Sequence, residues 1–206
     1  MDPVYKVLQQ FFETWNASGT MSGTSLYKHP DIVRACGEFD YKQHDALESF
    51  LIPLIRSCPH LYKLFYVEAL EQDDTSIVVE DNVLVHLPQL GDETILKQFK
   101  TLPVLLAVSV QPVAFHTVQW DAFRLPGYDI HGALLYTGHG LRGGHYRSLL
   151  YREYAPGKSI SGNVTALIYR STRATPSTTV RTYVKLTNIG NSCFRDCVLE
   201  LLNGIV

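Results

Sequence analysis

Apolar residues in the first third of the chain recur every three or four positions, which is the spacing of an amphipathic α-helix. Residues 3–16 show it most clearly, with one apolar face at Val4, Leu8, Phe11, Phe12 and Trp15. A second, short helix is predicted over residues 29–36. The stretch between them, residues 17–28, is small and polar, so we expect a loop there.

Residues 44–57 predict a longer helix. Its apolar stripe consists of Leu47, Phe50, Leu51, Leu54 and Ile55. Pro53 lies inside this stripe. Because proline has no amide hydrogen and its ring clashes with the preceding turn, we expect it to kink or shorten the helix.

From about residue 75 the pattern changes to short apolar runs separated by glycine and proline, which indicates β-strands. Residues 76–87 predict a hairpin that turns at Asp81 and Asn82. A short helix over 92–99 should precede strands over 103–110, 113–119, 128–137, 145–153 and 164–169. The Ser/Thr-rich residues 171–179 are typical of a linker, and a last helix is expected from about Cys193. Helices followed by strands favour an α+β fold, with the helices packed beside an antiparallel sheet.

Composition narrows the class of protein. The 206 residues suit one globular domain, and 46% hydrophobic with 18% charged residues excludes a disordered or fibrous chain. The net charge of −2 argues against a nucleic-acid partner, because phosphate binding favours a basic surface. No apolar run is long enough to span a membrane, and the first residues do not resemble a signal peptide.

The four cysteines favour a reducing compartment, the cytosol or the nucleus. They are Cys36, Cys58, Cys193 and Cys197, and no two of them form a C-x-x-C pair. A zinc ribbon is therefore not supported, and no metal or other cofactor is expected.

Cys193 is the candidate nucleophile. It follows Gly190, which allows a tight turn, and Asn191 or Ser192, either of which can cap a helix. At a helix start the dipole favours the thiolate, while Asn188 offers a side-chain amide nearby. The alternative is a buried cysteine that merely begins a helix.

His145 is the candidate general base. It begins a strand directly after Gly143 and Gly144, which leaves room for a substrate backbone. The alternative is an ordinary histidine at the end of a strand.

Together these segments resemble the ubiquitin-specific proteases. Asn-Ile-Gly-Asn-Ser-Cys-Phe (188–194) resembles the family's cysteine box, Asn-Leu-Gly-Asn-Thr-Cys-Tyr/Phe. Tyr-Asp-Ile-His-Gly-Ala (128–133) followed by Gly-Gly-His-Tyr (143–146) resembles its histidine box. Gln-His-Asp-Ala-Leu-Glu-Ser-Phe-Leu (43–51) resembles Gln-Gln-Asp-Ala-x-Glu-Phe-Leu, and Leu-Pro-Val-Leu-Leu (102–106) resembles the strand before the histidine box. The resemblance spans most of the chain.

The order of the boxes differs from the family, because the cysteine box comes last. A circular permutation explains this order, since joining Val206 to Met1 restores it. A second interpretation is that the cysteine box begins a second, truncated domain.

The resemblance implies a papain-like cysteine protease fold, circularly permuted, in a single domain over 1–206. Its helical thumb would cover 1–70, its antiparallel β palm 75–170, a linker 171–184, and the cysteine box and its helix 185–206. The family's zinc-binding fingers would be missing or reduced to the 75–87 hairpin, with no zinc.

The resemblance also assigns roles to individual residues. Cys193 would attack the isopeptide carbonyl after the Gly-Gly end of ubiquitin, His145 would transfer the proton, and Asn188 would stabilise the oxyanion. The third catalytic residue would be Ser161, or Asn163 if the alignment slips.

Substrate binding is assigned to residues of the two other boxes. Gly143 and Gly144 would form one wall of a slot for the ubiquitin tail, and Asp45 would pair with a tail arginine. Gln43 and Tyr146 are assigned to the same role.

The expected function is thus a thiol-dependent deubiquitinase whose partner is ubiquitin or a ubiquitinated protein. The alternatives are a ubiquitin-binding pseudo-enzyme, or a protease for a ubiquitin-like modifier or a viral polyprotein. Asp196 and Glu200 replace the family's usual Asn and Gln, which favours a divergent member, viral or from another fast-evolving lineage. A viral protein would act in the host cytoplasm. The oligomeric state is not predicted.

Overall fold

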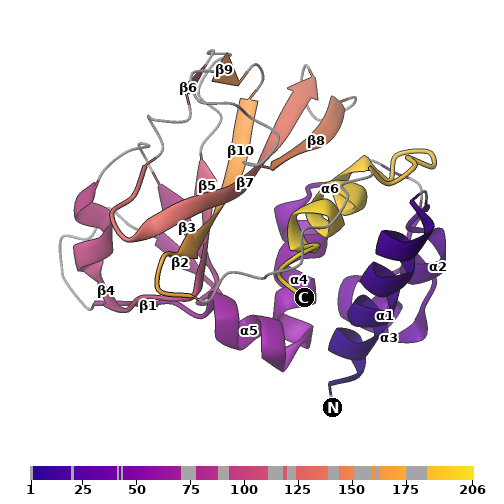
Figure 1. Cartoon of the computed structure of the whole chain (residues 1–206), viewed down its shortest axis with the longest axis horizontal. Helices are drawn as coiled ribbons and strands as arrows, with labels where there is room; N and C mark the ends of the chain where they lie inside the picture. Colours follow the sequence, from indigo (N-terminus) through magenta and orange to yellow (C-terminus); the bar gives the residue numbers. More distant parts are fainter. Residues whose placement is uncertain are drawn as a thin grey trace. The chain divides into compact units, whose positions relative to one another are not determined.

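The computed structural model describes most of the chain, in two compact units. The described residues are 2–19, 21–40, 42, 44–70, 78–87, 93–110, 118–119, 124–138, 144–150, 159–160, 163–174 and 185–206. The first unit comprises Met1–Tyr62, Gly138–Arg147 and Pro176–Val206, and the second comprises Lys63–Thr137 and Ser148–Thr175. Both chain ends therefore belong to the first unit, together with the cysteine segment and His145. Figure 1 labels the helices and strands along the chain.

Helices make up most of the first unit. They are α1 (Pro3–Ser18), α2 (Thr24–Tyr27), α3 (Pro30–Cys36), η1 (Leu47–Leu51), α4 (Ile52–Ser57) and α6 (Cys193–Leu202), and α5 (Pro59–Phe65) begins in this unit. The helices predicted over 3–16, 29–36 and from Cys193 are confirmed, and α1 buries the five apolar residues expected. The loop expected over 17–28 contains α2, whose single turn is too short to show a helical period.

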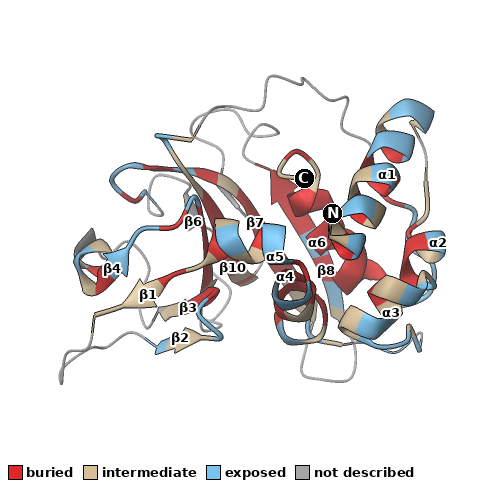
Figure 2. Cartoon of the chain, turned by 90° about the horizontal axis from the view of Figure 1, so that it is seen from below, coloured by how far each residue is buried: buried red, intermediate tan, exposed pale blue. Residues whose placement is uncertain are grey.

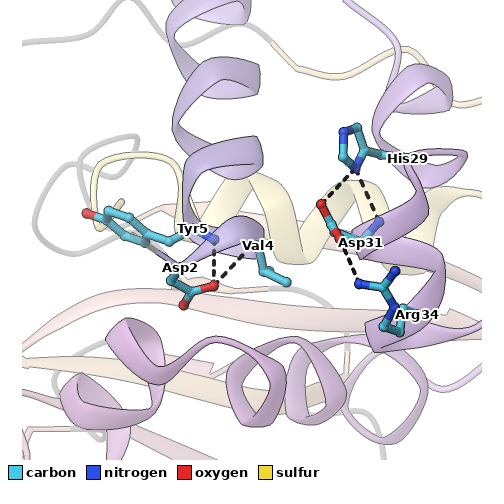
Figure 3. Close-up of polar contacts among 6 residues, drawn as sticks. All are labelled: Asp2, Val4, Tyr5, His29, Asp31 and Arg34. Atoms are coloured by element: carbon cyan, nitrogen blue, oxygen red, sulfur yellow. Dashed lines mark hydrogen bonds and ion pairs between the residues drawn. The ribbon is translucent and has the colours of Figure 1, made fainter.

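The first turns of α1 and α3 are fixed by side-chain caps (Figure 3). Asp2 Oδ1 accepts hydrogen bonds from the amides of Val4 and Tyr5, at 3.0 and 3.4 Å. His29 Nδ1 accepts one from the Asp31 amide at 3.3 Å. Each cap precedes a proline, which suits the first helical position because that amide needs no partner.

The helix predicted over 44–57 is two segments, and Pro53 explains the difference. In η1 the chain forms a wider, π-helical turn, in which the Leu51 amide donates to the Ala46 carbonyl at 3.0 Å. The proline ring cannot donate to Ser49, so widening the turn before it avoids the clash. α4 then starts with Pro53 in its first turn, and the predicted apolar stripe is buried along both segments.

Strands make up most of the second unit. A six-stranded sheet has the order β2 (Val78–Glu80), β3 (Leu84–Leu87), β5 (Leu105–Val110), β10 (Asn163–Ser171), β7 (Tyr128–Gly138) and β8 (Gly144–Leu150). Two smaller sheets pair β1 (Glu68–Ala69) with β4 (Phe99–Thr101), and β6 (Val118–Gln119) with β9 (Ser159–Ile160). A 3₁₀ helix, η2 (Glu93–Gln98), lies at the predicted 92–99 helix. The expected α+β class is therefore observed.

The hairpin over 76–87 is confirmed within the described residues. Asp81 and Asn82 both have positive φ, 51° and 59°, and the Val83 amide donates to the Glu80 carbonyl at 3.0 Å, which closes a tight turn between the paired residues Glu80 and Leu84. The expectation of a wholly antiparallel sheet is wrong, because β3 pairs with β5 in parallel. The connection between them, which contains η2 and β4, is long enough to bring the chain back in the same direction.

Each unit has buried residues, which Figure 2 marks, and most of them are apolar. In the second unit the inward faces of β5, β7 and β10 supply most of the buried residues, including Leu106, Val108, Leu135, Leu167 and Tyr169. In the first unit the largest fully buried side chains come from α1, α2, η1 and α6, and include Trp15, Tyr27, Phe50 and Phe194. None of the described helices is both long and apolar enough to cross a lipid bilayer.

The cap of α1 gives the first prediction. Replacing Asp2 with Ala removes the acceptor for two amides and should lower the free energy of unfolding by about 1 kcal/mol. Asp2→Asn keeps an oxygen at the same position and should cost only a few tenths of that amount. Urea unfolding followed by far-UV circular dichroism measures both, and equal losses in the two variants would contradict the capping role.

Candidate active site

The segment before Cys193 is held at its start by hydrogen bonds from two consecutive backbone amides. The Thr187 amide donates to the Met21 carbonyl at 3.0 Å, and the Leu186 amide donates to Glu200 Oε1 at 3.0 Å. After these two residues the chain turns at Gly190, whose φ of 54° is costly for other residues. The turn delivers the chain to α6, which begins at Cys193.

Ser192 joins the loop to the first turn of α6. Its hydroxyl oxygen accepts a hydrogen bond from the Ile189 amide at 2.9 Å. The same oxygen lies 3.0 Å from Asn188 Oδ1 and 2.5 Å from Asp196 Oδ2. Ser192, one of the two residues expected to cap α6, lies at the N-cap position, but its side chain binds no amide of the helix. It bonds instead to the loop that carries Asn188.

Tyr27 completes this network from α2. Its hydroxyl donates a hydrogen bond to Asp196 Oδ1, and its ring is 2% exposed. Gly23 lies directly against the ring, where a Cβ atom would meet the Tyr27 phenol at 2.3 Å. Glycine at position 23 therefore makes room for the tyrosine that reaches Asp196. No pattern in the sequence indicates Tyr27, because one helical turn has no apolar period.

Asp196 carries a proton more readily than an ordinary aspartate. Burial raises the pKa of its carboxyl to about 6; hydrogen bonds from Ser192 and Tyr27 oppose this shift, and the Glu200 carboxylate adds to it. The pKa of Tyr27 is raised well above its usual value, first by burial and then by Asp196. The carboxyl thus titrates within the pH range in which enzymes are usually assayed.

Cys193 is distinguished from the other cysteines by its position at the start of a helix. All four are free thiols. Burial is the main cause that raises the pKa of Cys36 and of Cys58 to about 12, which disfavours the reactive thiolate. Cys197 lies one turn further along α6, 4% exposed, and is a core residue as predicted. Cys193, also 4% exposed, is the cysteine at the start of a helix, next to the Ser192 network.

Arg195 fixes the first turn of α6 from the other side. Its guanidinium is buried, 3% exposed, and Nη2 donates to the carbonyls of Gly37 and Glu38 at 3.3 and 3.4 Å. The guanidinium carbon lies 5.1–5.6 Å from four ring centroids, those of Tyr27, Phe39, Phe50 and Phe194. These rings stabilise the cation by their negative faces, although burial lowers its pKa.

The cysteine helix packs against the segment that follows Gln43, more than 140 positions earlier. α6 contacts η1, and the Phe194 ring lies 5.5 Å from that of His44 and 6.4 Å from that of Phe39. Two of the predicted boxes therefore come together within one unit.

Asp45 links η1 to the strand of His145. Its Oδ1 accepts hydrogen bonds from the amides of Leu47 and Glu48, at 2.8 and 2.9 Å, and so caps the helical segment. Its Oδ2 accepts one from the Tyr146 hydroxyl at 3.1 Å. In β8 the side chains alternate, so His145 is exposed while Tyr146 is 7% exposed. Tyr146 thus positions β8 against the start of η1.

The remaining predicted site residues are placed as follows. Gly144 begins β8. Asn163 begins β10 in the second unit, and its buried Oδ1 has no hydrogen-bond partner among the described residues. Gln43, Gly143 and Ser161 lie outside the described residues. In the part of the chain that is described, no three His, Cys, Asp or Glu side chains are grouped to hold a metal ion.

Comparison with known proteins adds no family assignment. No protein-family model matches the sequence, and no curated protein matches it significantly.

The Asp196 network gives the second prediction, on pH and stability. Because the folded-state pKa is above the unfolded value near 3.8, the folded state binds the proton more tightly. The contribution is fully present below about pH 4 and is lost as the pH rises through about 6, at a cost of about 3 kcal/mol. Asp196→Asn should flatten this part of the profile of unfolding free energy against pH.

Asp40 offers the control. It is an exposed carboxylate whose pKa is lowered, chiefly by a hydrogen bond from His44, so its own contribution changes below pH 4. Asp40→Asn should leave the slope between pH 4.5 and 7 as in the wild type. If the Asp196→Asn variant kept the wild-type slope of unfolding free energy against pH, the slope would belong to another titrating group.

Proposed function

We propose that the chain is a cysteine-type deubiquitinase that resembles the ubiquitin-specific proteases, with a papain-like fold in circularly permuted order. The observation that carries the proposal is the placement of Cys193 at the start of the buried helix α6. Next to it Asn188 is tethered through Ser192. His145, Asp45 and Tyr146 belong to the same unit, on segments matched to the family's other boxes.

In the proposed reaction, Cys193 attacks the carbonyl of the last glycine of ubiquitin where it joins a lysine side chain. His145 takes the thiol proton and then gives it to the leaving amine. The Asn188 amide and the backbone N–H of Cys193 stabilise the oxyanion of the tetrahedral intermediate. Water then hydrolyses the thioester, with His145 again as the base, and frees the enzyme. The third catalytic residue stays Ser161 or Asn163.

The packing of α6 supports a permuted single domain over a second, truncated one. Three residues of α6 contact residues 1–62: Arg195 donates to the Gly37 carbonyl, Asp196 accepts from Tyr27, and the Phe194 ring lies near that of Phe39. A helix that began a separate domain would need other partners for these buried charges.

Substrate binding is proposed for the exposed face around Asp45 and Gly144. The Asp45 carboxylate is exposed and retains lone pairs for a charge-assisted bond to an arginine of the ubiquitin tail. Tyr146 was expected to touch substrate. Because its hydroxyl is bonded to Asp45, we now assign it the role of orienting that carboxylate.

Reaction with a ubiquitin probe that ends in an electrophile tests the nucleophile. The wild type should form a covalent adduct one ubiquitin larger, and Cys193→Ala should form none. Cys36→Ala, the matched control, should react like the wild type because its thiol is held protonated. If ubiquitin bound without forming an adduct, the chain would be a ubiquitin-binding pseudo-enzyme instead. If ubiquitin neither bound nor formed an adduct, it would not be the partner.

Steady-state cleavage of a fluorogenic ubiquitin substrate tests Asn188. At pH 5.5, where Asp196 is mostly protonated, Asn188→Ala should lower kcat by about 100-fold, with a smaller change in KM, because the oxyanion forms only in the transition state. Asn191→Ala changes the same residue type on the same exposed loop and should stay within about threefold of the wild type. Similar losses in the two variants would mean that the loop, rather than the Asn188 amide, is what matters.

A further inference from the structure

The Ser192 hydroxyl has one hydrogen and faces two oxygen acceptors. They are Asn188 Oδ1 at 3.0 Å and Asp196 Oδ2 at 2.5 Å. The hydroxyl oxygen also accepts from the Ile189 amide. A hydroxyl can donate one hydrogen bond and accept two, so it cannot donate to both oxygens at once.

Two arrangements satisfy all of these groups. When Asp196 carries a proton, it donates to Ser192, and Ser192 donates to the oxygen of the Asn188 amide. When Asp196 is ionised, Ser192 donates to the carboxylate, and the amide must turn so that its nitrogen donates to Ser192. In each arrangement the hydroxyl makes one donated and two accepted bonds. The amide end away from Ser192 is NH₂ in the first and oxygen in the second.

We propose that Asp196 is a positioning residue that sets, through the single Ser192 hydrogen, which end of the Asn188 amide is presented to the oxyanion. The inference rests on the proposed role of Asn188 as the oxyanion donor. With Asp196 protonated, the NH₂ group is presented and stabilises the oxyanion. With Asp196 ionised, an oxygen is presented, which repels the developing negative charge.

Among the charged and titratable groups around Asp196, its own proton decides which of the two arrangements forms. Tyr27 of α2 donates to the other carboxylate oxygen in both arrangements. Glu200, one turn along α6, is buried and repels a negative charge on Asp196. The Arg195 guanidinium faces four aromatic rings, and its electrostatic partners are Tyr27, Cys36 and Asp40. In η1, which packs against α6, the ionisable residue Glu48 is exposed.

The Asp196→Asn variant should hold the network in one of the two arrangements. The amide of an asparagine can donate to Ser192 and accept from Tyr27, which copies the protonated state at every pH. Glu200→Gln is the matched control. It removes a buried charge from the same helix, keeps an oxygen for the Leu186 amide, and leaves Ser192 untouched.

The first readout is kcat for a ubiquitin substrate across pH 5.5–8. The ratio of kcat for Asp196→Asn to kcat for the wild type should rise about tenfold over this range, since the wild type loses its donor. Glu200→Gln should keep the wild-type form of the profile with its midpoint moved to lower pH. A ratio that does not vary with pH would overturn the proposal.

The second readout needs no activity. The side-chain amide signals of Asn188 in a ¹⁵N–¹H spectrum, identified by their loss in Asn188→Ala, should titrate with the Asp196 carboxyl carbon. They should be independent of pH in Asp196→Asn, and uncoupled from Asp196 in Ser192→Ala. Asn188 signals that ignore the Asp196 titration would overturn the inference. If the wild type does not cleave ubiquitin, the proposed function falls while this titration still decides the role of Asp196.

Discussion

The burial of α6 is the constraint on which the rest of the first unit depends. All ten residues of this helix are buried, and three of them are Arg195, Asp196 and Glu200 (Figure 2). A buried charge costs several kcal/mol unless it is paired or hydrogen-bonded, so each of the three dictates what must surround it. Arg195 is surrounded by four aromatic rings, Asp196 is bonded to Tyr27 and Ser192, and Glu200 is bonded to the Leu186 amide. These contacts offset the cost of burying the three polar side chains.

These partners also order the loop that carries the candidate chemistry. Glu200 holds Leu186, Asp196 holds Ser192, and Ser192 holds the side chain of Asn188. The exposed loop is thereby tied at several points to a helix that cannot move without exposing buried charge. Preorganisation of this kind is what oxyanion stabilisation requires, because donors fixed in advance need no reorganisation during the reaction. The same polar residues therefore cost stability in the core and supply order at the surface.

The sequence predicts those parts of the fold whose signal is local and periodic. The apolar face of α1, the Asp81–Asn82 turn and the start of the helix at Cys193 follow from spacing and turn chemistry alone. The parallel pairing of β3 with β5 could not be predicted, because a strand pattern does not reveal the direction of its neighbour. The sequence predicts that Pro53 kinks or shortens the helix but not that the turn before it is π-helical, since the way a helix avoids a proline depends on its packing.

Some residues of the candidate site can be predicted from the sequence and others cannot. Cys193, His145, Asn188 and Asp45 could be named from short motifs. Tyr27 could not, because its bond to Asp196 joins residues 169 positions apart. The linking role of Ser192 could not either, because a residue pattern does not show which neighbour its hydroxyl binds. The hydrogen bond from Tyr146 to Asp45 could not be predicted either, since alternation in a strand gives the face of a residue but not its partner.

The central claim is that one buried helix presents both the nucleophile and the tethered amide to the same reacting carbon. A crystal structure of the chain joined covalently to an electrophilic ubiquitin tests it most directly. The account predicts a bond to Cys193 Sγ, with the nitrogen of the Asn188 amide and the Cys193 backbone N–H facing the oxygen that represents the oxyanion. Attachment at another residue, or an Asn188 side chain turned away from that oxygen, would contradict it.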